Sequence, residues 1–168
     1  MQEIMVLNPE NVGVQEAETY GIREAARAVV IDEQRLVALL HVSKDEYYKL
    51  PGGGLEDAED PIAALKRECQ EEIGCDIQVM NEIGMITEYR KKYSLKQVSY
   101  CYVVKVIGGK SIPAFTDDEI KHGFKVVWLA YEKAKEAMER SRLSEYESVY
   151  IVPRDKALLE AARYYFSS

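Results

Sequence analysis

Between residues 51 and 74, a glycine-rich loop leads into a helix whose two ends are both marked in the sequence. Pro51–Gly54 reads PGGG, and three glycines after a proline predict a loop rather than a regular element. Asp60 can cap a helix that starts at Pro61, because the N–H that proline lacks would be unpaired there anyway. Gly74 predicts a left-handed helix end. The fold must therefore place an open loop directly before a helix.

This predicted helix carries an apolar stripe at spacings of three and four residues, which is typical of a helix that faces the core; the stripe is Ile62, Leu65, Cys69 and Ile73. At about 100° per residue, Glu68, Glu71 and Glu72 share one flank beside it. Acids four residues apart repel, and acids in the last turn oppose the helix dipole, at roughly 0.3–1 kcal/mol each. A divalent cation would relieve both conflicts, and carboxylates without a His or thiolate cluster suit Mg²⁺ or Mn²⁺. The alternative is a solvated acidic face, with Arg67 paired to a neighbouring acid.

The rest of the chain predicts strands before and after this helix, and two further helices. No internal repeat or low-complexity linker divides it, so residues 1–168 are predicted to form a single domain, with residues 1–20 as an N-terminal arm or an irregular edge strand. This order of elements predicts an α/β (α+β) fold with a mixed sheet between helices. The predicted strands are Ala25–Ile31, Leu36–Val42, Glu46–Leu50, 76–93 with a break near 82–84, Gln97–Ile107 and Phe124–Ala130, and the further helices are Tyr131–Arg140 and Arg154–Phe166, with Pro153 near the start of the second.

Charge and composition exclude several classes of partner. The formal net charge is −7, which argues against nonspecific binding to nucleic-acid polymers. No apolar run approaches the roughly 18–20 residues that a membrane helix needs, and residues 1–8 do not resemble a signal peptide. The three cysteines lack CxxC spacing, so a zinc site or a disulfide framework is not expected and a cytoplasmic location fits best. An acidic protein can still bind a phosphorylated small molecule through divalent cations.

The segment Gly53–Cys75 resembles the Nudix box, G-x5-E-x7-R-E-U-x-E-E-x-G-U, in which U is a bulky apolar residue. Its seven fixed positions are all filled, and Cys69 and Cys75 stand at the two apolar ones. The flanks are also similar to the family: Tyr48 stands before the box where Trp is frequent, and Trp128 ends a strand shortly before a helix. One departure is Ala58, where many members have glycine. The fixed residues are Gly53, Glu59, Arg67, Glu68, Glu71, Glu72 and Gly74.

This resemblance implies a Nudix-type α/β/α sandwich and the attack of water on a phosphorus of a diphosphate, with metal ions between the substrate and the box. It implies that Glu68, Glu71 and Glu72 are metal ligands and that the backbone around Gly52 and Gly53 is a further contact to the metal. Arg67 would orient the glutamates, and Glu59 would pair with Arg67 or reach the metal network. Such chemistry needs charge neutralisation and in-line placement of the reacting groups.

Residues outside the box have less certain roles. The general base is either a box glutamate or an acid from a later loop, where Glu119 is the candidate and a solvated acidic turn is the alternative. His41 could contact phosphate or base, although a half-buried strand histidine is the simpler interpretation. Lys49 and Arg27 flank the expected cleft and could contact phosphates, but either could be a surface charge. The tyrosines of the last third could stack on a base, pack internally or contact a second copy in a homodimer.

The substrate is a small nucleotide by this resemblance, and a nucleoside triphosphate, such as an oxidised dGTP, is the first expectation. Cleavage would then give the monophosphate and pyrophosphate. An ADP-sugar or a dinucleoside polyphosphate is the alternative substrate. A non-catalytic nucleotide sensor is the competing class, although no box glutamate is missing.

Overall fold

A seven-stranded mixed sheet forms the middle layer of the computed structural model, which describes residues 1–166. The order of the main path is β1-β5-β6-β2-β3-β4, and β7 pairs with β3. β2 runs parallel to β6 and β1 runs parallel to β5, whereas the other pairs are antiparallel. The strands are β1 (Glu3–Leu7), β2 (Gly21–Ile31), β3 (Val37–Val42), β4 (Tyr47–Lys49), β5 (Cys75–Arg90), β6 (Leu95–Lys110) and β7 (Phe124–Leu129).

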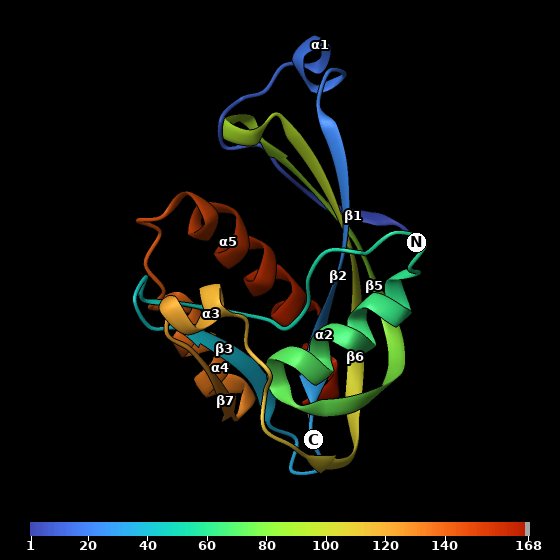
Figure 1. The fold of residues 1–168 in the computed structure, drawn as a ribbon, viewed down its shortest axis with the longest axis vertical. Coiled ribbons are helices and arrows are strands. Elements are labelled where there is room, and N and C mark those ends of the chain that lie inside the picture. Colours follow the sequence, from blue (N-terminus) through green and yellow to red (C-terminus); the bar gives the residue numbers. More distant parts are fainter. Residues whose placement is uncertain (167–168) are drawn as a thin grey trace.

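Helices cover both faces of this sheet (Figure 1). On one face, Leu65, Cys69 and Ile73 of α2 (Pro61–Ile73) pack against alternate residues of β2, β3 and β6. On the other face, α4 (Tyr131–Glu139) and α5 (Tyr146–Ala161) pack against the intervening residues, among them Val29 and Leu39. The expected α/β/α sandwich with a mixed sheet is therefore confirmed.

The long strands β2, β5 and β6 extend past the helical layers to a small cap at the top of Figure 1. This cap contains α1 (Val14–Ala17) and the 3₁₀ turn η1 (Lys91–Tyr93). Residues 1–20 thus supply an edge strand, as one of the two interpretations predicted, and also a short helix that was not predicted. Residues 167 and 168, the end of the predicted domain, lie outside the described part of the chain.

Among the predictions that the structure corrects, two concern β5 and the last helix. The strand predicted to break near residue 82 is continuous, because register shifts between Val79 and Asn81 and between Glu82 and Gly84 absorb the irregularity as bulges. The last helix starts at Tyr146 rather than at Arg154, and Pro153 lies inside it. Glu145 and Ser148 form a capping box at its true start, where the two side chains and backbone N–H groups bond reciprocally.

The connection after β6 contains α3 (Asp117–Lys121), a short helix where only an acidic turn was expected. Thr116 caps it, and the Glu119 carboxylate accepts a hydrogen bond from the Thr116 backbone N–H. The chain ends in the 3₁₀ turn η2 (Arg163–Tyr165). Within residues 1–166, no helix has the length and apolar character that crossing a membrane requires.

Candidate active site

The helix that carries the box acids has the predicted ends. The Asp60 carboxylate accepts hydrogen bonds from the backbone N–H groups of Ile62 and Ala63, and Pro61 occupies the first helical position. Gly74 ends the helix with φ at 64°, a conformation that glycine adopts without steric cost. Of the three glutamates, Glu68 and Glu72 lie against the glycine loop, which we define as Pro51–Gly54, whereas Glu71 is half exposed.

Glu72 is the most buried of the three, with only 2% of its surface exposed. One carboxylate oxygen accepts a hydrogen bond from Lys49 Nζ at 2.8 Å, and the other accepts from the Gly52 backbone N–H at 2.7 Å. Burial raises the pKa of Glu72, although Lys49 and the Gly52 N–H oppose the shift. A buried carboxylate therefore joins α2 to the glycine loop.

Arg67 connects Glu68 to the first box glutamate, Glu59. Its guanidinium donates to Glu59 at 3.1 and 2.9 Å, to Glu68 at 2.9 Å, and to the carbonyl oxygen of Gly54 at 2.9 Å. Hydrogen bonds to Glu59 and Glu68 raise the pKa of Arg67 despite partial burial, and the same Arg67 contact lowers the pKa of Glu59. Arg67 thus pairs with Glu59, as one of the expected roles has it, and also holds Glu68 in place.

Glu71 is the exposed member of the group, with half of its side-chain surface in contact with solvent. It lies 3.4 Å from Arg67, and its backbone carbonyl accepts a hydrogen bond from the Ala114 N–H at 2.7 Å. The segment after β6 is thereby tied to the C-terminal end of α2, on the side where Glu71 faces solvent.

The glycine loop fits only because Gly52 and Gly53 lack side chains. A Cβ on Gly53 would lie 2.1 Å from a Glu68 carboxylate oxygen, and one on Gly52 would lie 2.1 Å from the backbone oxygen of Ala26. Gly52 also has φ at 129°, which residues with side chains rarely adopt. The loop backbone therefore lies against β2 on one side and against the Glu68 carboxylate on the other.

The donor set around this loop consists of carboxylate and backbone oxygens, the ligands that Mg²⁺ and Mn²⁺ prefer. The Lys49 ammonium already forms an ion pair with Glu72, so the position beside this carboxylate accommodates a positive charge. Within residues 1–166, no three acidic, histidine or cysteine side chains converge on one point as they stand, since Lys49 and Arg67 hold Glu72 and Glu68 in separate pairs. The residues present fit a divalent ion once one or both pairs open.

The structure does not bring His41 or Glu119 to this group. His41 shares the β3 face of Leu39, opposite α2, and its ring stacks on Tyr48 with centroids 4.4 Å apart. The Glu119 carboxylate accepts hydrogen bonds from Thr116 N and Oγ1 within its own helical turn. Arg27, interpreted as either a phosphate contact or a surface charge, is no surface charge, because it is only 7% exposed.

Sequence reasoning missed a set of buried charges behind the glycine loop. Asp155 and Arg154 of α5 and Glu88 of β5 are fully buried, and Asp155 accepts a hydrogen bond from the Leu50 N–H at 2.7 Å. The predicted helix start at Arg154 would place Arg154 and Asp155 in an exposed first turn, where an acid is ordinary. A correct start at Tyr146 would have put Asp155 in the helix interior, and that was the signal available.

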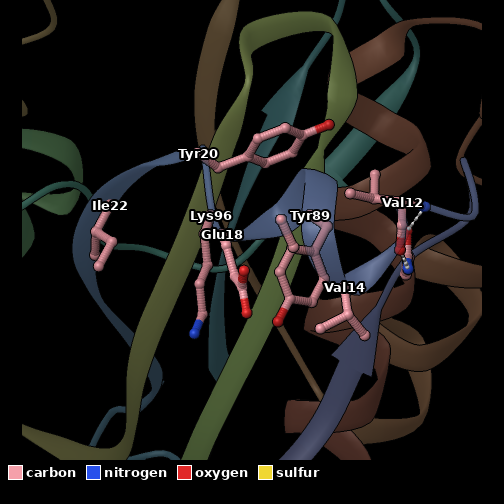
Figure 2. A pocket seen from close by; sticks show the side chains of 9 residues that line it. Val12, Val14, Glu18, Tyr20, Ile22, Tyr89 and Lys96 are labelled. Carbon is pink, nitrogen blue, oxygen red and sulfur yellow. Dashed lines mark hydrogen bonds between the residues drawn. The ribbon is translucent and has the colours of Figure 1, made fainter.

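Cavities lie on several sides of the molecule. One of about 390 Å³, shown in Figure 2, is lined by Tyr20, Tyr89 and Lys96 and belongs to the cap around α1 rather than to the box. Another, of about 540 Å³, borders Glu59 and Arg23 beside the box loop. A third, of about 260 Å³, lies beside Phe124, whose ring is 5.0 Å from Lys49 Nζ.

Comparisons with known proteins find the same fold in several solved structures. The chain is similar in structure to a NUDIX hydrolase from Nitrosomonas europaea (TM-score 0.64, 16% identity, 87% of this chain and 91% of that one). It is also similar to the E. coli ORF135 protein (TM-score 0.59, 19% identity, 88% and 92%) and to the C. elegans Ap4A hydrolase (TM-score 0.59, 15% identity, 88% and 100%). No curated protein matches the sequence significantly.

The family model of the NUDIX domain matches residues 21–148, which include β2, the glycine loop and the whole of α2. This match covers well over half of the 168 residues. Nudix proteins generally need a divalent metal ion. The chain therefore belongs to the NUDIX domain family, and it is a Nudix hydrolase that acts on nucleoside diphosphate derivatives.

Proposed function

We propose that this chain hydrolyses a phosphoanhydride bond of a small nucleotide with Mg²⁺ or Mn²⁺, and that a nucleoside triphosphate is the substrate, yielding the monophosphate and pyrophosphate. The observation that carries this proposal is the convergence of Glu72, Glu68 and the glycine loop. Gly52 N–H bonds to Glu72 at 2.7 Å, and the missing Cβ of Gly53 leaves room for the Glu68 carboxylate. A phosphate chain can approach such an open backbone closely.

The metal-binding residues in this proposal are Glu68, Glu71 and Glu72, together with the Gly53 backbone. A divalent ion bound there would neutralise the anionic diphosphate and lower the pKa of the attacking water. Arg67, held by Glu59 and Glu68, fixes the direction in which the Glu68 carboxylate points. Lys49 would leave Glu72 when the ion binds, and its ammonium would then be free to donate to a phosphate oxygen.

The general base is the least constrained part of this proposal. Glu71 is the exposed acid of the box, and its side-chain contact is the 3.4 Å pair with Arg67, so its carboxylate is the most accessible to an attacking water. Glu119 could serve only after α3 moves or its carboxylate leaves Thr116. Replacing each by glutamine separately tests the two candidates: the base is the residue whose loss changes the pH dependence of kcat while the metal concentration needed for activity stays the same, because loss of a metal ligand would change both.

The third cavity supports a nucleoside as part of the substrate. It lies beside Phe124, whose ring also contacts Lys49, and aromatic rings line much of its wall. Such rings can stack on a nucleobase, and acidic side chains in the same wall can accept hydrogen bonds from base amino groups. Its aromatic lining is Tyr47, Tyr93, Phe124 and Tyr146, and its acids are Asp45, Asp118, Glu145 and Glu147.

The test is a product assay over a panel of canonical and oxidised nucleoside triphosphates, ADP-sugars and dinucleoside polyphosphates, each with Mg²⁺ and with Mn²⁺. Release of monophosphate and pyrophosphate from a triphosphate would support the proposal. Preferential turnover of an ADP-sugar or a dinucleoside polyphosphate would support the proposed reaction but contradict the proposed substrate. Nucleotide-induced stabilisation without turnover of any compound would identify a sensor instead.

A further inference from the structure

The glycine loop is fixed from the side of α5 as well as from the box. On the box side, Glu72 binds the Gly52 N–H and Arg67 binds the Gly54 carbonyl. On the other side, a carboxylate oxygen of Asp155 accepts the Leu50 N–H at 2.7 Å, directly before the loop begins. Lys49, the residue before Leu50, is the one whose ammonium holds Glu72.

Asp155 is itself held by buried charges. Its second oxygen accepts Arg154 Nε at 2.7 Å, and Arg154 NH1 donates to Glu88 at 3.1 Å. None of these three side chains is more than 1% exposed. The carboxylate that receives the Leu50 N–H is therefore fixed by an ionic chain running from α5 to the central strands.

This chain of contacts returns to the far end of the loop. Glu88 accepts Gln97 Nε2 at 2.9 Å, and the Gln97 oxygen accepts Arg23 NH1 at 3.1 Å. The Arg23 guanidinium lies against Gly54, where an added Cβ would be 3.0 Å from NH2. The buried ionic chain thus holds the loop where it starts, and through Gln97 it connects to the exposed Arg23 guanidinium beside the end of the loop.

Stability alone does not explain such a network. Burying each ion costs several kcal/mol, and apolar residues of similar volume are often as stable or more stable. The Leu50 N–H could also be satisfied by a water molecule at much lower cost. What a buried carboxylate adds is a fixed position for one backbone amide, and that amide adjoins the residues that touch Glu72 and Glu68.

We propose that Asp155 is a positioning residue for hydrolysis, with Arg154 and Glu88 as its supports. By holding Leu50, it fixes the backbone from which Lys49 extends, keeps the Gly52 N–H on Glu72 and keeps the Gly53 backbone against Glu68. This inference rests on the function proposed above, because it assumes that reaction occurs at these carboxylates. Asp155 touches no substrate and acts only through the loop.

The test uses Asp155→Asn in the full chain. Asparagine has nearly the same shape but no charge, and Arg154 keeps its partner Glu88, so the fold is expected to survive. We expect kcat to fall about 10- to 100-fold with KM within about 3-fold, because a small misplacement of reacting groups has effects of this size. We also expect amide hydrogen exchange to accelerate in the peptide covering residues 47–55, with little change elsewhere.

Asp32→Asn is the matched control. Asp32 is also a buried aspartate that accepts backbone N–H groups, those of Gln34 and Leu36, and pairs with Lys110. It contacts no residue of the glycine loop, so this variant should lose stability without a fall in kcat or faster exchange at 47–55. Equal losses of kcat in the two variants would reduce Asp155 to a structural residue and overturn the proposal.

Hydrogen exchange separates this inference from the proposed function, since it needs no substrate. If no nucleotide is turned over by the wild type, the proposed function fails, while unchanged exchange at 47–55 in Asp155→Asn would independently refute the positioning role. If Asp155→Asn does not fold, the double variant Arg154→Gln/Asp155→Asn removes both charges together and is judged by the same exchange and kcat criteria. Normal exchange and normal kcat in either folded variant overturn the inference.

Discussion

At Gly53, the absence of one methyl group decides where the Glu68 carboxylate can lie. Gly53→Ala places a Cβ about 2.1 Å from Glu68 Oε1, so the carboxylate must move. We expect kcat to fall by about 10²-fold and the stabilisation by Mg²⁺ to weaken, while the fold survives because Glu68 is flexible at its end. Gly13→Ala is the control, since no atom lies within 4 Å of its added Cβ. A metal-induced shift in Tm equal to that of wild type would contradict this view.

Glu72→Gln separates the metal role of this residue from its structural role. Glutamine can still accept the Gly52 N–H, but it leaves the Lys49 ammonium without its anion. We expect kcat to fall by several orders of magnitude and the unfolding free energy without metal to fall by about 1–3 kcal/mol, the cost of an unmade buried hydrogen bond. Steady-state kinetics and urea unfolding measure the two effects. Unchanged turnover would rule out Glu72 as a metal ligand.

At the level of single residues, the sequence predicts the contacts between side chains that are close to each other along the chain. The contacts of Arg67 with Glu59, Glu68 and Glu71 all lie within eight positions. Spacing suggested a pair with a neighbouring acid, and the resemblance to the Nudix box implied Glu59 as its partner. The contact of Leu50 with Asp155 spans 105 positions, and no local signal marks it. The Lys49–Glu72 ion pair, 23 positions apart, lies between these cases, because the box predicted Glu72 near the loop but not which cation would hold it.

Among the elements, α5 contains a proline in its interior, and replacing this residue should stabilise the helix. Pro153 lies in the eighth position of the helix, where it removes one backbone hydrogen bond. It is only partly buried, so alanine should leave little cavity. We expect Pro153→Ala to raise stability by about 1–3 kcal/mol, somewhat below the full penalty of an interior proline, as measured by thermal unfolding.

Lys156→Ala is the control for this prediction, because Lys156 is exposed on the same helix. Its effect should stay within about 0.5 kcal/mol. A Pro153→Ala protein no more stable than wild type would mean that the helix has already adapted to the proline, for example by a bend that satisfies the freed carbonyl.

The same helix shows why some elements were predicted and others were not. α2 was predicted to the residue because its cap, its first-turn proline and its terminal glycine are all local signals. α5 was predicted to start eight residues late because a proline normally marks a helix start, whereas here burial against the sheet outweighs that preference. The bulges of β5 form only through pairing with β6, which the sequence of β5 alone does not show. The segment around Gly84 was therefore interpreted as a break in the strand.

For the whole molecule, the buried charges between the sheet and α5 make stability depend on pH. Burial alone would raise the pKa of Glu88, but Arg154 and Arg90 outweigh it and hold the pKa below its ordinary value. A carboxylate with a lowered folded-state pKa stabilises the fold fully above its unfolded pKa, about 4.3. This stabilisation is lost as the pH falls through the lower, folded-state value.

Glu88→Gln should therefore cost most at neutral pH. We expect its unfolding free energy at pH 7 to be about 3–5 kcal/mol below that of wild type, since it breaks a buried ionic pair. The difference should shrink as the pH falls below about 4, because the wild-type carboxylate is then protonated too. Urea unfolding across pH 3–7 measures it, with Glu82→Gln, an exposed glutamate on the same strand, as control. A constant difference across this range would mean that the Glu88 charge does not matter.

The parallel pairing of β2 with β6 also determines the order in which the chain can assemble. Each residue of Gly21–Ile31 finds its partner 74 positions later, whereas β5 and β6 are joined by a single short turn. During synthesis, the edge of residues 21–31 that pairs with β6 stays unpaired until residue 105 has left the ribosome. Residues 75–110 can pair with one another as soon as they have emerged, because their partners are close along the chain. Closing this long loop is the slow step for such a topology. Until it pairs, the exposed edge of residues 21–31 is the part of the nascent chain most open to aggregation.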